Sequence, residues 1–276
     1  MSSTRQEVAN SKLEVGLLGP LVVSKGGRPI PVAGPKPRAL LAILALDAGR
    51  VVSADRLVEE LWPEQPPGTA GHAVQVYVSQ LRKALGADAI STQRPGYVLV
   101  LDPEHIDVHR FERLADEGRA ALQVGDPIAA ERALREALAL WRGSALADFT
   151  YEPFAQAEIA RLEELRLVAL EERVEADLEL GRHAGLVSEL EALVHAQPLR
   201  ERPRAQHMLA LYRSGRQAEA LAAYRRARET LVEEVGIEPG PALRELEGAI
   251  LRQDQSLLLP ETATARPSRR TLAAAA

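Results

Sequence analysis

The segment TAGHAVQVYVSQLRKALG, residues 69–86, is the most informative stretch of the chain. Residues of an α-helix advance by about 100° per position, so regularly spaced apolar residues fall on one stripe. The stripe here consists of Ala70, Val74, Val78, Leu81 and Leu85. The segment begins at Thr69 and ends at Gly86, a residue type that commonly follows a helix. This pattern predicts a helix that packs one face on a core and presents the other to solvent.

The opposite face of this helix carries chemically mixed side chains: His72, Gln75, Val76, Ser79, Arg82 and Lys83. Glutamine can pair with adenine, arginine can pair with guanine, and an aliphatic group can contact a thymine methyl. Any amphipathic helix has a polar face, however. Taken alone, this set leaves base recognition and an ordinary solvated surface equally open.

The flanking segments complete a recognisable order of elements. Before this segment we expect short strands and two helices. The first helix covers residues 35–49, and the second is capped by Ser53 and ended by Pro63. After the segment, residues 89–93 and 97–101 form a hairpin. The expected strands before the first helix are Leu13–Leu18, Leu21–Ser24 and Pro29–Val32, with a Gly-Gly turn at residues 26–27. A helical pair followed by a β-hairpin is typical of a winged helix–turn–helix.

Four further polar residues are candidates for contacts with phosphate. Arg94 lies near the hairpin tip with Thr92 beside it, where the arginine could enter a minor groove or hold a phosphate. Lys36 and Arg38 begin the first helix, where backbone N–H groups favour anions. The alternative for Arg94 is a solvated turn cation. For Lys36 and Arg38, a solvated surface is the favoured alternative. Trp62 is expected to fill the core between helices.

From Asp107 onward the sequence is rich in Ala, Leu, Glu and Arg, and it predicts helices throughout. We expect them near residues 107–124, 127–141, 153–180, 183–196, 201–213, 216–234 and 241–254. The breaks at Gly181 and Gly215 are about 34 residues apart, the period of a tetratricopeptide repeat, and Ala220 and Tyr224 fit that repeat. An ordinary helical bundle is the alternative. The predicted fold is an α+β winged helix–turn–helix domain followed by an all-α tetratricopeptide-repeat-like domain.

These patterns suggest four segments. Residues 1–12 form a flexible arm, 13–102 the winged helix, 103–255 the helical domain, and 256–276 a disordered tail. No stretch reaches the roughly 20 apolar residues that span a bilayer, and the N-terminus lacks the apolar core of a signal peptide. We therefore expect a cytoplasmic protein without a membrane partner.

Charge is divided unevenly along the chain. The formal net charge is −5, which is unlike a generic nucleic-acid binder. Residues 1–104, however, hold 11 basic and 10 acidic side chains, so the acidic excess belongs to the rest. The absence of cysteine excludes disulfides and cysteine-ligated metal sites. No HExxH, GxSxG or phosphate-binding glycine loop occurs, so we expect no enzyme activity, cofactor or metal.

Two stretches together resemble a known family. Residues 74–85, VQVYVSQLRKAL, followed by Gln93-Arg94-Pro95-Gly96-Tyr97, resemble the OmpR/PhoB-type DNA-binding domain. The helical half, and above all its closing stretch from Tyr224 to Gly240, resembles the bacterial transcriptional activation domain. The pairing is similar to the Streptomyces antibiotic regulatory protein family, the group of AfsR, DnrI and RedD.

The resemblance implies a sequence-specific activator of a secondary-metabolite gene cluster. Such proteins bind direct repeats in double-stranded promoter DNA near the −35 region, with a second protomer alongside, and recruit RNA polymerase holoenzyme with its sigma factor. The base-facing positions of the family match His72, Gln75, Val76, Ser79 and Lys83, with Arg82 close by, and the wing position matches Arg94. The polymerase-facing loop matches Glu64, Gln65, Pro66 and Pro67.

Two departures limit this transfer. Ser79 and Gln80 stand where some relatives have arginines, so base preference does not carry over. We also expect no phosphoacceptor receiver ahead of the winged helix, and hence no phosphorylation-driven dimerisation. The alternative function is an interaction scaffold that uses the helical repeats and lacks productive DNA binding. A weaker hypothesis adds a binding surface on the concave side of the repeats.

Overall fold

The computed structural model describes residues 13–259 of the chain. These residues form two compact units, divided between Ala176 and Asp177. The first unit therefore contains the expected winged helix together with the first helices that follow it. The expected N-terminal arm, and residues 260–276 of the expected tail, lie outside the described residues. At the start of that tail, residues Gln255–Leu257 form a short 3-10 turn, η4.

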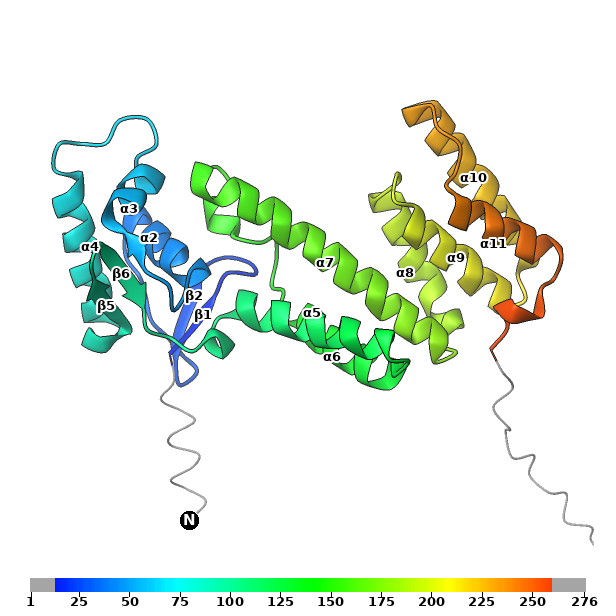
Figure 1. Ribbon diagram of the computed structural model, residues 1–276, viewed down its shortest axis with the longest axis horizontal. Coiled ribbons are helices and arrows are strands. Elements are labelled where there is room, and N and C mark those ends of the chain that lie inside the picture. The colour runs from blue at the N-terminus through cyan, green and yellow to red at the C-terminus, as the bar shows by residue number, and fades with distance from the viewer. Residues whose placement is uncertain (1–12, 260–276) are drawn as a thin grey trace, which may run out of the picture. The chain divides into compact units, whose positions relative to one another are not determined.

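The N-terminal part of the first unit has the predicted order of short strands and three helices (Figure 1). Its elements are β1 (Leu13–Gly16), β2 (Val22–Lys25), β3 (Arg28–Pro29), α2 (Pro35–Leu46), β4 (Val52–Ser53), α3 (Ala54–Leu61), α4 (Ala70–Leu85), η1 (Ala87–Ala89), β5 (Ile90–Gln93) and β6 (Gly96–Leu99). Ser53 caps α3 as expected, since its hydroxyl accepts a hydrogen bond from the Arg56 amide at 3.1 Å.

The strands form two small antiparallel sheets, with orders β1-β2-β3 and β4-β6-β5. The hairpin β5–β6 is the predicted wing, with Gln93 opposite Gly96. The sequence did not reveal the third strand of this sheet. Val51 and Val52 were expected to be only an extended link and Ser53 only a helix cap, but Val52 and Ser53 pair with Tyr97 and Gly96. The end of β6 next to the hairpin turn is thus fixed to the segment that leads into α3.

The core of the first unit is continuous from the winged helix into the following helices. In α2 the side chains from Ala39 to Ala45 are buried, which agrees with the apolar character of this helix. One apolar cluster includes Leu57 of α3, Val78 of α4, Leu99 of β6 and Phe111 of the next helix. Burial of such side chains contributes about 1.5–3 kcal/mol each relative to exposure.

The remaining elements are helical, as predicted. They are η2 (Pro103–His105), α5 (Asp107–Gln123), α6 (Pro127–Ala139), η3 (Ala147–Phe149), α7 (Pro153–Glu179), α8 (His183–Ala196), α9 (Glu201–Arg213), α10 (Gln217–Val235) and α11 (Pro241–Leu251). Three helix–helix turns have glycine with φ near +75°: Gly125, Gly181 and Gly215. This left-handed conformation ends a helix at little cost only when the residue is glycine.

In the second unit, the side chains that suggested a repeat lie in the core. Ala220 and Ala227 are fully buried on α10, and Tyr224 between them is 7% exposed. The small side chains of Ala220 and Ala227 permit close packing of α10 against α9. None of the helices in residues 13–259 is long and apolar enough to cross a membrane.

Hydrogen bonds across the first unit tie the winged helix to the helices that follow. The carboxylate of Asp107, at the start of α5, accepts hydrogen bonds from the amides of Leu17 and Leu18 at 2.6 and 3.0 Å. The amides of Arg142 and Leu146 in turn donate to the carbonyls of Leu18 and Leu17. These contacts explain why the compact unit extends well past the expected winged-helix boundary at residue 102.

Candidate nucleic-acid interface

Helix α4 has the two faces that its sequence predicted. Ala70, Val74, Val78, Leu81 and Leu85 are all buried, and each is at most 5% exposed. On the opposite face His72, Gln75, Val76, Ser79 and Lys83 are exposed. The hydrophobic side of the helix is therefore fully used by the core, and the polar side remains open to a partner.

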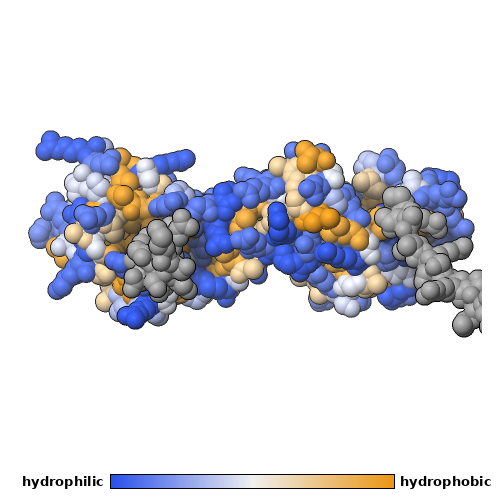
Figure 2. All heavy atoms as spheres, turned by 90° about the horizontal axis from the view of Figure 1, so that it is seen from below, coloured by the Kyte–Doolittle hydropathy of each residue, from blue (hydrophilic) through white to orange (hydrophobic). Residues whose placement is uncertain are grey.

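Val76 is an apolar residue within this polar face, and it is 39% exposed. Hydrophobic residues also reach the surface elsewhere in both units, amid a mostly hydrophilic covering (Figure 2). Several of these, such as Val124, Ile128 and Val235, lie at helix ends. Val76 instead lies in mid-helix between Gln75 and Ser79, where an aliphatic group can contact a thymine methyl.

Arg82 is placed differently from its neighbours on α4. It is only partly exposed, and its guanidinium donates from Nε to the Ile90 carbonyl at 2.8 Å and from Nη2 to the Thr92 hydroxyl at 2.7 Å. The side chain thus connects the recognition face of α4 to the first strand of the wing. The sequence grouped Arg82 with the base-facing residues and did not reveal this bond.

The wing brings Arg94 beside that link. Arg94 and Pro95 are exposed at the hairpin turn, and the Pro95 carbonyl accepts a hydrogen bond from the Ala54 amide at the start of α3. A Cβ on Gly96 would lie 1.8 Å from the Val52 carbonyl oxygen, so only glycine fits at this point. β4 therefore holds β6 directly behind the turn, while Arg94 and Pro95 in the turn itself stay exposed.

Lys83 and Arg94 share one electrostatic property. Neither forms an ion pair with a carboxylate of the described residues, and both are exposed. Lys83 also lies in the last turn of α4. These two cations, with the hydroxyl of Thr92 between α4 and the wing tip, are available to a phosphate backbone.

Lys36 and Arg38, in contrast, are paired with other groups of the protein. The Lys36 ammonium donates to the Leu61 carbonyl at 2.7 Å and lies 3.7 Å from the Glu152 carboxylate. Arg38 forms an ion pair with Asp148. Both cations start α2 as expected, but they face carboxylates that lie more than 100 residues later in the chain.

The loop between α3 and α4 is open to solvent. Glu64, Gln65, Pro66 and Pro67 are all exposed. The loop begins after Trp62, which is partly buried and stacks on Tyr77 of α4 with ring centroids 6.2 Å apart. Trp62 thus packs between the two helices, as expected, and anchors one end of the loop.

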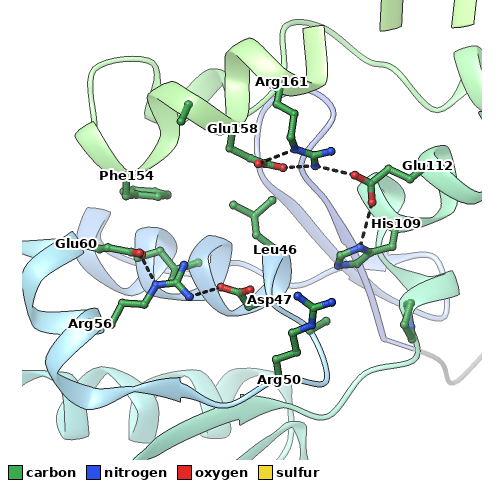
Figure 3. Close-up of a pocket in the computed structure, with 14 residues that line it drawn as sticks. Leu46, Asp47, Arg50, Arg56, Glu60, His109, Glu112, Phe154, Glu158 and Arg161 are labelled. Atoms are coloured by element: carbon green, nitrogen blue, oxygen red, sulfur yellow. Dashed lines mark hydrogen bonds and ion pairs between the residues drawn. The ribbon is translucent and has the colours of Figure 1, made fainter. Parts of the chain in front are cut away.

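A cavity of about 510 Å³ lies between the winged helix and the helices α5 and α7 (Figure 3). On the winged-helix wall, Arg56 pairs with Asp47 at 2.7 Å and with Glu60 at 2.6 Å. On the other wall, Arg161 pairs with Glu158 and Glu112. Leu46 lies between the two ionic clusters. Each wall therefore satisfies its own charges.

His109 connects the two walls of this junction cavity. Its Nε2 lies 3.0 Å from the Ala45 carbonyl near the end of α2, and its Nδ1 lies 3.5 Å from the Glu112 carboxylate. Contact with Glu112, and then the carbonyl of Ala45, raises the pKa of His109 against the opposing effect of burial. Because both neighbours are hydrogen-bond acceptors, the doubly protonated ring satisfies them best.

Comparison with known proteins agrees with both halves of this architecture. Residues 28–99 match the family described as "Transcriptional regulatory protein, C terminal", and residues 106–251 match the "Bacterial transcriptional activator domain". The chain is 45% identical over 256 residues to the regulatory protein DnrI of Streptomyces peucetius, which covers 89% of this chain and 94% of that protein. The chain belongs to the Streptomyces antibiotic regulatory protein family.

Other members of the family are larger than this chain. It is 44% identical to the regulatory protein AfsR of Streptomyces coelicolor, with 97% of this chain but only 27% of AfsR covered. The solved structure of Mycobacterium tuberculosis EmbR, in complex with a low affinity phosphopeptide, superposes with a TM-score of 0.84 at 39% identity. That match covers 88% of this chain and 65% of EmbR. The protein is a transcriptional regulator of this family with a winged helix and a helical activation domain.

No set of three or more His, Asp or Glu side chains in residues 13–259 is placed to hold a metal ion. The candidate site is therefore described by its hydrogen-bonding and charged side chains. His72, Gln75, Val76, Ser79 and Lys83 lie together on α4, with Arg82, Thr92 and Arg94 at the wing. Lys36 and Arg38 belong to α2, and the α3–α4 loop is a further segment of the winged helix.

Proposed function

We propose that this protein is a sequence-specific DNA-binding transcription activator that inserts α4 into the major groove of promoter DNA. One observation carries the proposal. A buried apolar stripe fixes α4 on the core, while its outer face and the adjacent wing present hydrogen-bonding groups and cations without carboxylate partners. A major groove admits a single α-helix, and its base edges offer donors and acceptors to such a face.

Within this interface the side chains have different tasks. His72, Gln75, Val76 and Ser79 contact base edges, and Lys83 contacts either a base or the adjacent phosphate. Arg94 and Thr92 contact the backbone or the minor groove beside the wing. Arg82 acts in part by holding the wing to α4, because its guanidinium is bound to Ile90 and Thr92.

Lys36 and Arg38 contribute less to DNA binding than Lys83 and Arg94 do. A phosphate at the start of α2 must compete with the carboxylates of Glu152 and Asp148. Substitution of these two residues is therefore expected to affect DNA affinity less than substitution of Lys83 or Arg94.

The partners follow from the family. We propose that two protomers bind side by side on direct repeats near the −35 region, about one helical turn apart. The exposed loop residues Glu64, Gln65, Pro66 and Pro67 then face RNA polymerase holoenzyme and its sigma factor. Residues 13–102 serve as the DNA-binding domain and residues 103–255 as the activation domain, in the cytoplasm and without enzymatic activity.

The kind of gene cluster is proposed from the relatives. DnrI of Streptomyces peucetius and RedD of Streptomyces coelicolor are regulators that match 89% and 92% of this chain. We propose that the protein activates a secondary-metabolite cluster, most directly an antibiotic cluster encoded near its own gene.

The test is a fluorescence-anisotropy titration with promoter DNA from the neighbouring cluster. Gln75→Ala should weaken binding and relax preference at one base pair, with a cost of about 1–3 kcal/mol. Gln123→Ala, at the exposed end of α5, is the matched control. Unchanged affinity and unchanged preference for Gln75→Ala would remove this face of α4 from the interface and favour a scaffold role.

A further inference from the structure

A second cavity, of about 450 Å³, lies between helices α8, α9 and α10 of the second unit. Its lining combines apolar groups, such as Val194 and Ala223, with the side chains of Arg204, His207 and Arg226. This cavity is separate from α4 and the wing, and nothing in DNA binding accounts for it.

Arg204 is unusual for a cation in this protein. The residue is 6% exposed, and its Nε and Nη2 both donate to a single acceptor, the Pro198 carbonyl. Within residues 13–259 no carboxylate forms an ion pair with it. Burial lowers the pKa of its guanidinium. Glu234 and Glu201 act on it only through space, without an ion pair. A buried charge without an ion-pair partner is costly, so a site that keeps one usually has a partner for it.

Two further groups in the lining suit the same partner. His207 is 7% exposed, and burial lowers the pKa of its imidazole, so the neutral ring can donate one hydrogen bond. Arg226 is exposed on α10, and no carboxylate of the described part of the chain pairs with it. The carboxylates that do line the cavity, Glu191 and Glu234, are themselves exposed to water.

The junction cavity in the first unit gives a useful contrast. There Arg56 and Arg161 each pair with two carboxylates of the protein itself, as Figure 3 shows. In the second cavity Glu191 and Glu234 also lie in the lining, but no carboxylate of the described residues forms an ion pair with Arg204 or Arg226. The apolar groups beside them indicate that the partner is more than a bare inorganic ion.

We propose that the cavity between α8, α9 and α10 binds a small organic anion. Its carboxylate or phosphate group pairs with Arg204 and Arg226, and its apolar body packs against Val194 and Ala223. Arginine suits both groups because its donors can bind two oxygens at once. Such a ligand would give the activation domain an input that is independent of promoter sequence.

The test uses the full chain and simple probes observed by NMR. Benzoate and phenyl phosphate are titrated separately while the ring signals of His207 are followed, with benzamide as a neutral isostere of benzoate. We expect saturable shifts with at least one of the two anions and none with benzamide. The stronger of the two anions identifies which group the site prefers. Equal shifts with benzamide, or no shift with either anion, would overturn the proposal.

Neighbouring arginines on α10 provide a matched pair of variants. Arg226 lines the cavity and Arg225 does not, and both are exposed, so neither substitution disturbs the core. Arg226→Ala should weaken binding of the preferred anion by about tenfold, the loss of one charge-assisted contact. Arg225→Ala should leave binding unchanged. Equal effects of the two substitutions, or no effect of Arg226→Ala, would place the anion elsewhere.

Discussion

Two exposed cations of α4 and the wing have surroundings opposite to those of two arginines of α5. Lys83 and Arg94 are exposed without a carboxylate partner among the described residues. In α5, Arg113 binds Glu104 and Glu117, and Arg110 binds Glu136. The net charge of −5 is therefore a poor guide to DNA binding. A phosphate backbone responds to cations that are free to meet it, wherever the acidic excess lies.

A cation's position in the winged helix does not by itself make it available to DNA. Lys36 and Arg38 belong to the same winged helix as α4 and the wing, yet they pair with Glu152 and Asp148. Exposed ion pairs of this kind contribute only about 0–1 kcal/mol to stability. Their larger consequence is to reduce the positive charge that the start of α2 offers to DNA.

The largest expected effect comes from removing both unpaired cations. Lys83→Ala combined with Arg94→Ala should weaken promoter binding by about 30-fold or more, since two lost contacts at about 1–3 kcal/mol each amount to about 2–6 kcal/mol. Fluorescence anisotropy measures this directly. Arg28→Ala in β3 is the control, because Arg28 is exposed but lies outside α4 and the wing. An equal loss of DNA affinity in the control would mean that any exposed cation contributes to binding, and this would contradict the special role of Lys83 and Arg94.

The next effect concerns the pairing of β6 with β4, directly after the turn of the wing. Gly96→Val should destabilise the protein by more than about 2 kcal/mol, because its Cβ meets the Val52 carbonyl at 1.8 Å and overpacking is costly. Chemical denaturation measures the change. Gly185→Ala in α8 is the counterpart in the helical half, since its Cβ has no heavy atom within 4 Å, and it should be neutral or stabilising. A tolerated Gly96→Val would show that β4 does not hold the wing.

A somewhat smaller loss is expected at the link between the winged helix and α5. Asp107→Ala leaves the amides of Leu17 and Leu18 without their acceptor and should cost about 1–3 kcal/mol. Asp116→Ala, on the exposed side of the same helix, should change stability by less than about 1 kcal/mol. Similar losses for the two variants would argue against Asp107 as the link.

The smallest effect is a pH dependence at the junction cavity. The pKa of His109 is raised above its ordinary value of 6.5 by Glu112 and the Ala45 carbonyl. Its contribution to stability is therefore complete below about pH 6.5 and is lost as the pH rises through the raised value. Between pH 6 and pH 9, wild type should lose more stability than His109→Gln. Substitution of His195, which is exposed, should leave the wild-type pH dependence in place. Parallel curves for wild type and His109→Gln would contradict this.

The helices could be predicted from sequence because each carries its own signals. The apolar stripe of α4, the cap at Ser53, and the glycines at residues 125, 181 and 215 are local features. The pairing of β4 with β6 could not be read in this way, because two residues are too few to show alternation. Their partner Tyr97 also lies some 45 residues later in the chain.

In the candidate site, too, local features could be predicted from the sequence and tertiary contacts could not. The exposed face of α4 follows from helical periodicity alone. The bond from Arg82 to Thr92 and the ion pairs of Lys36 and Arg38 depend on tertiary contacts that no local pattern encodes. Side chains that look alike in the sequence therefore acquire different roles once the chain folds.

Salt dependence tests the account most directly, because each phosphate contact adds about 0.9 to the slope of log affinity against log salt concentration. We compare Lys83→Ala/Arg94→Ala with Arg110→Ala/Arg113→Ala, a pair of substitutions at arginines bound to glutamate. The first variant should show a slope reduced by about one to two contacts, and the second should match wild type. A reduced slope in the second variant with an unchanged slope in the first would contradict the central claim.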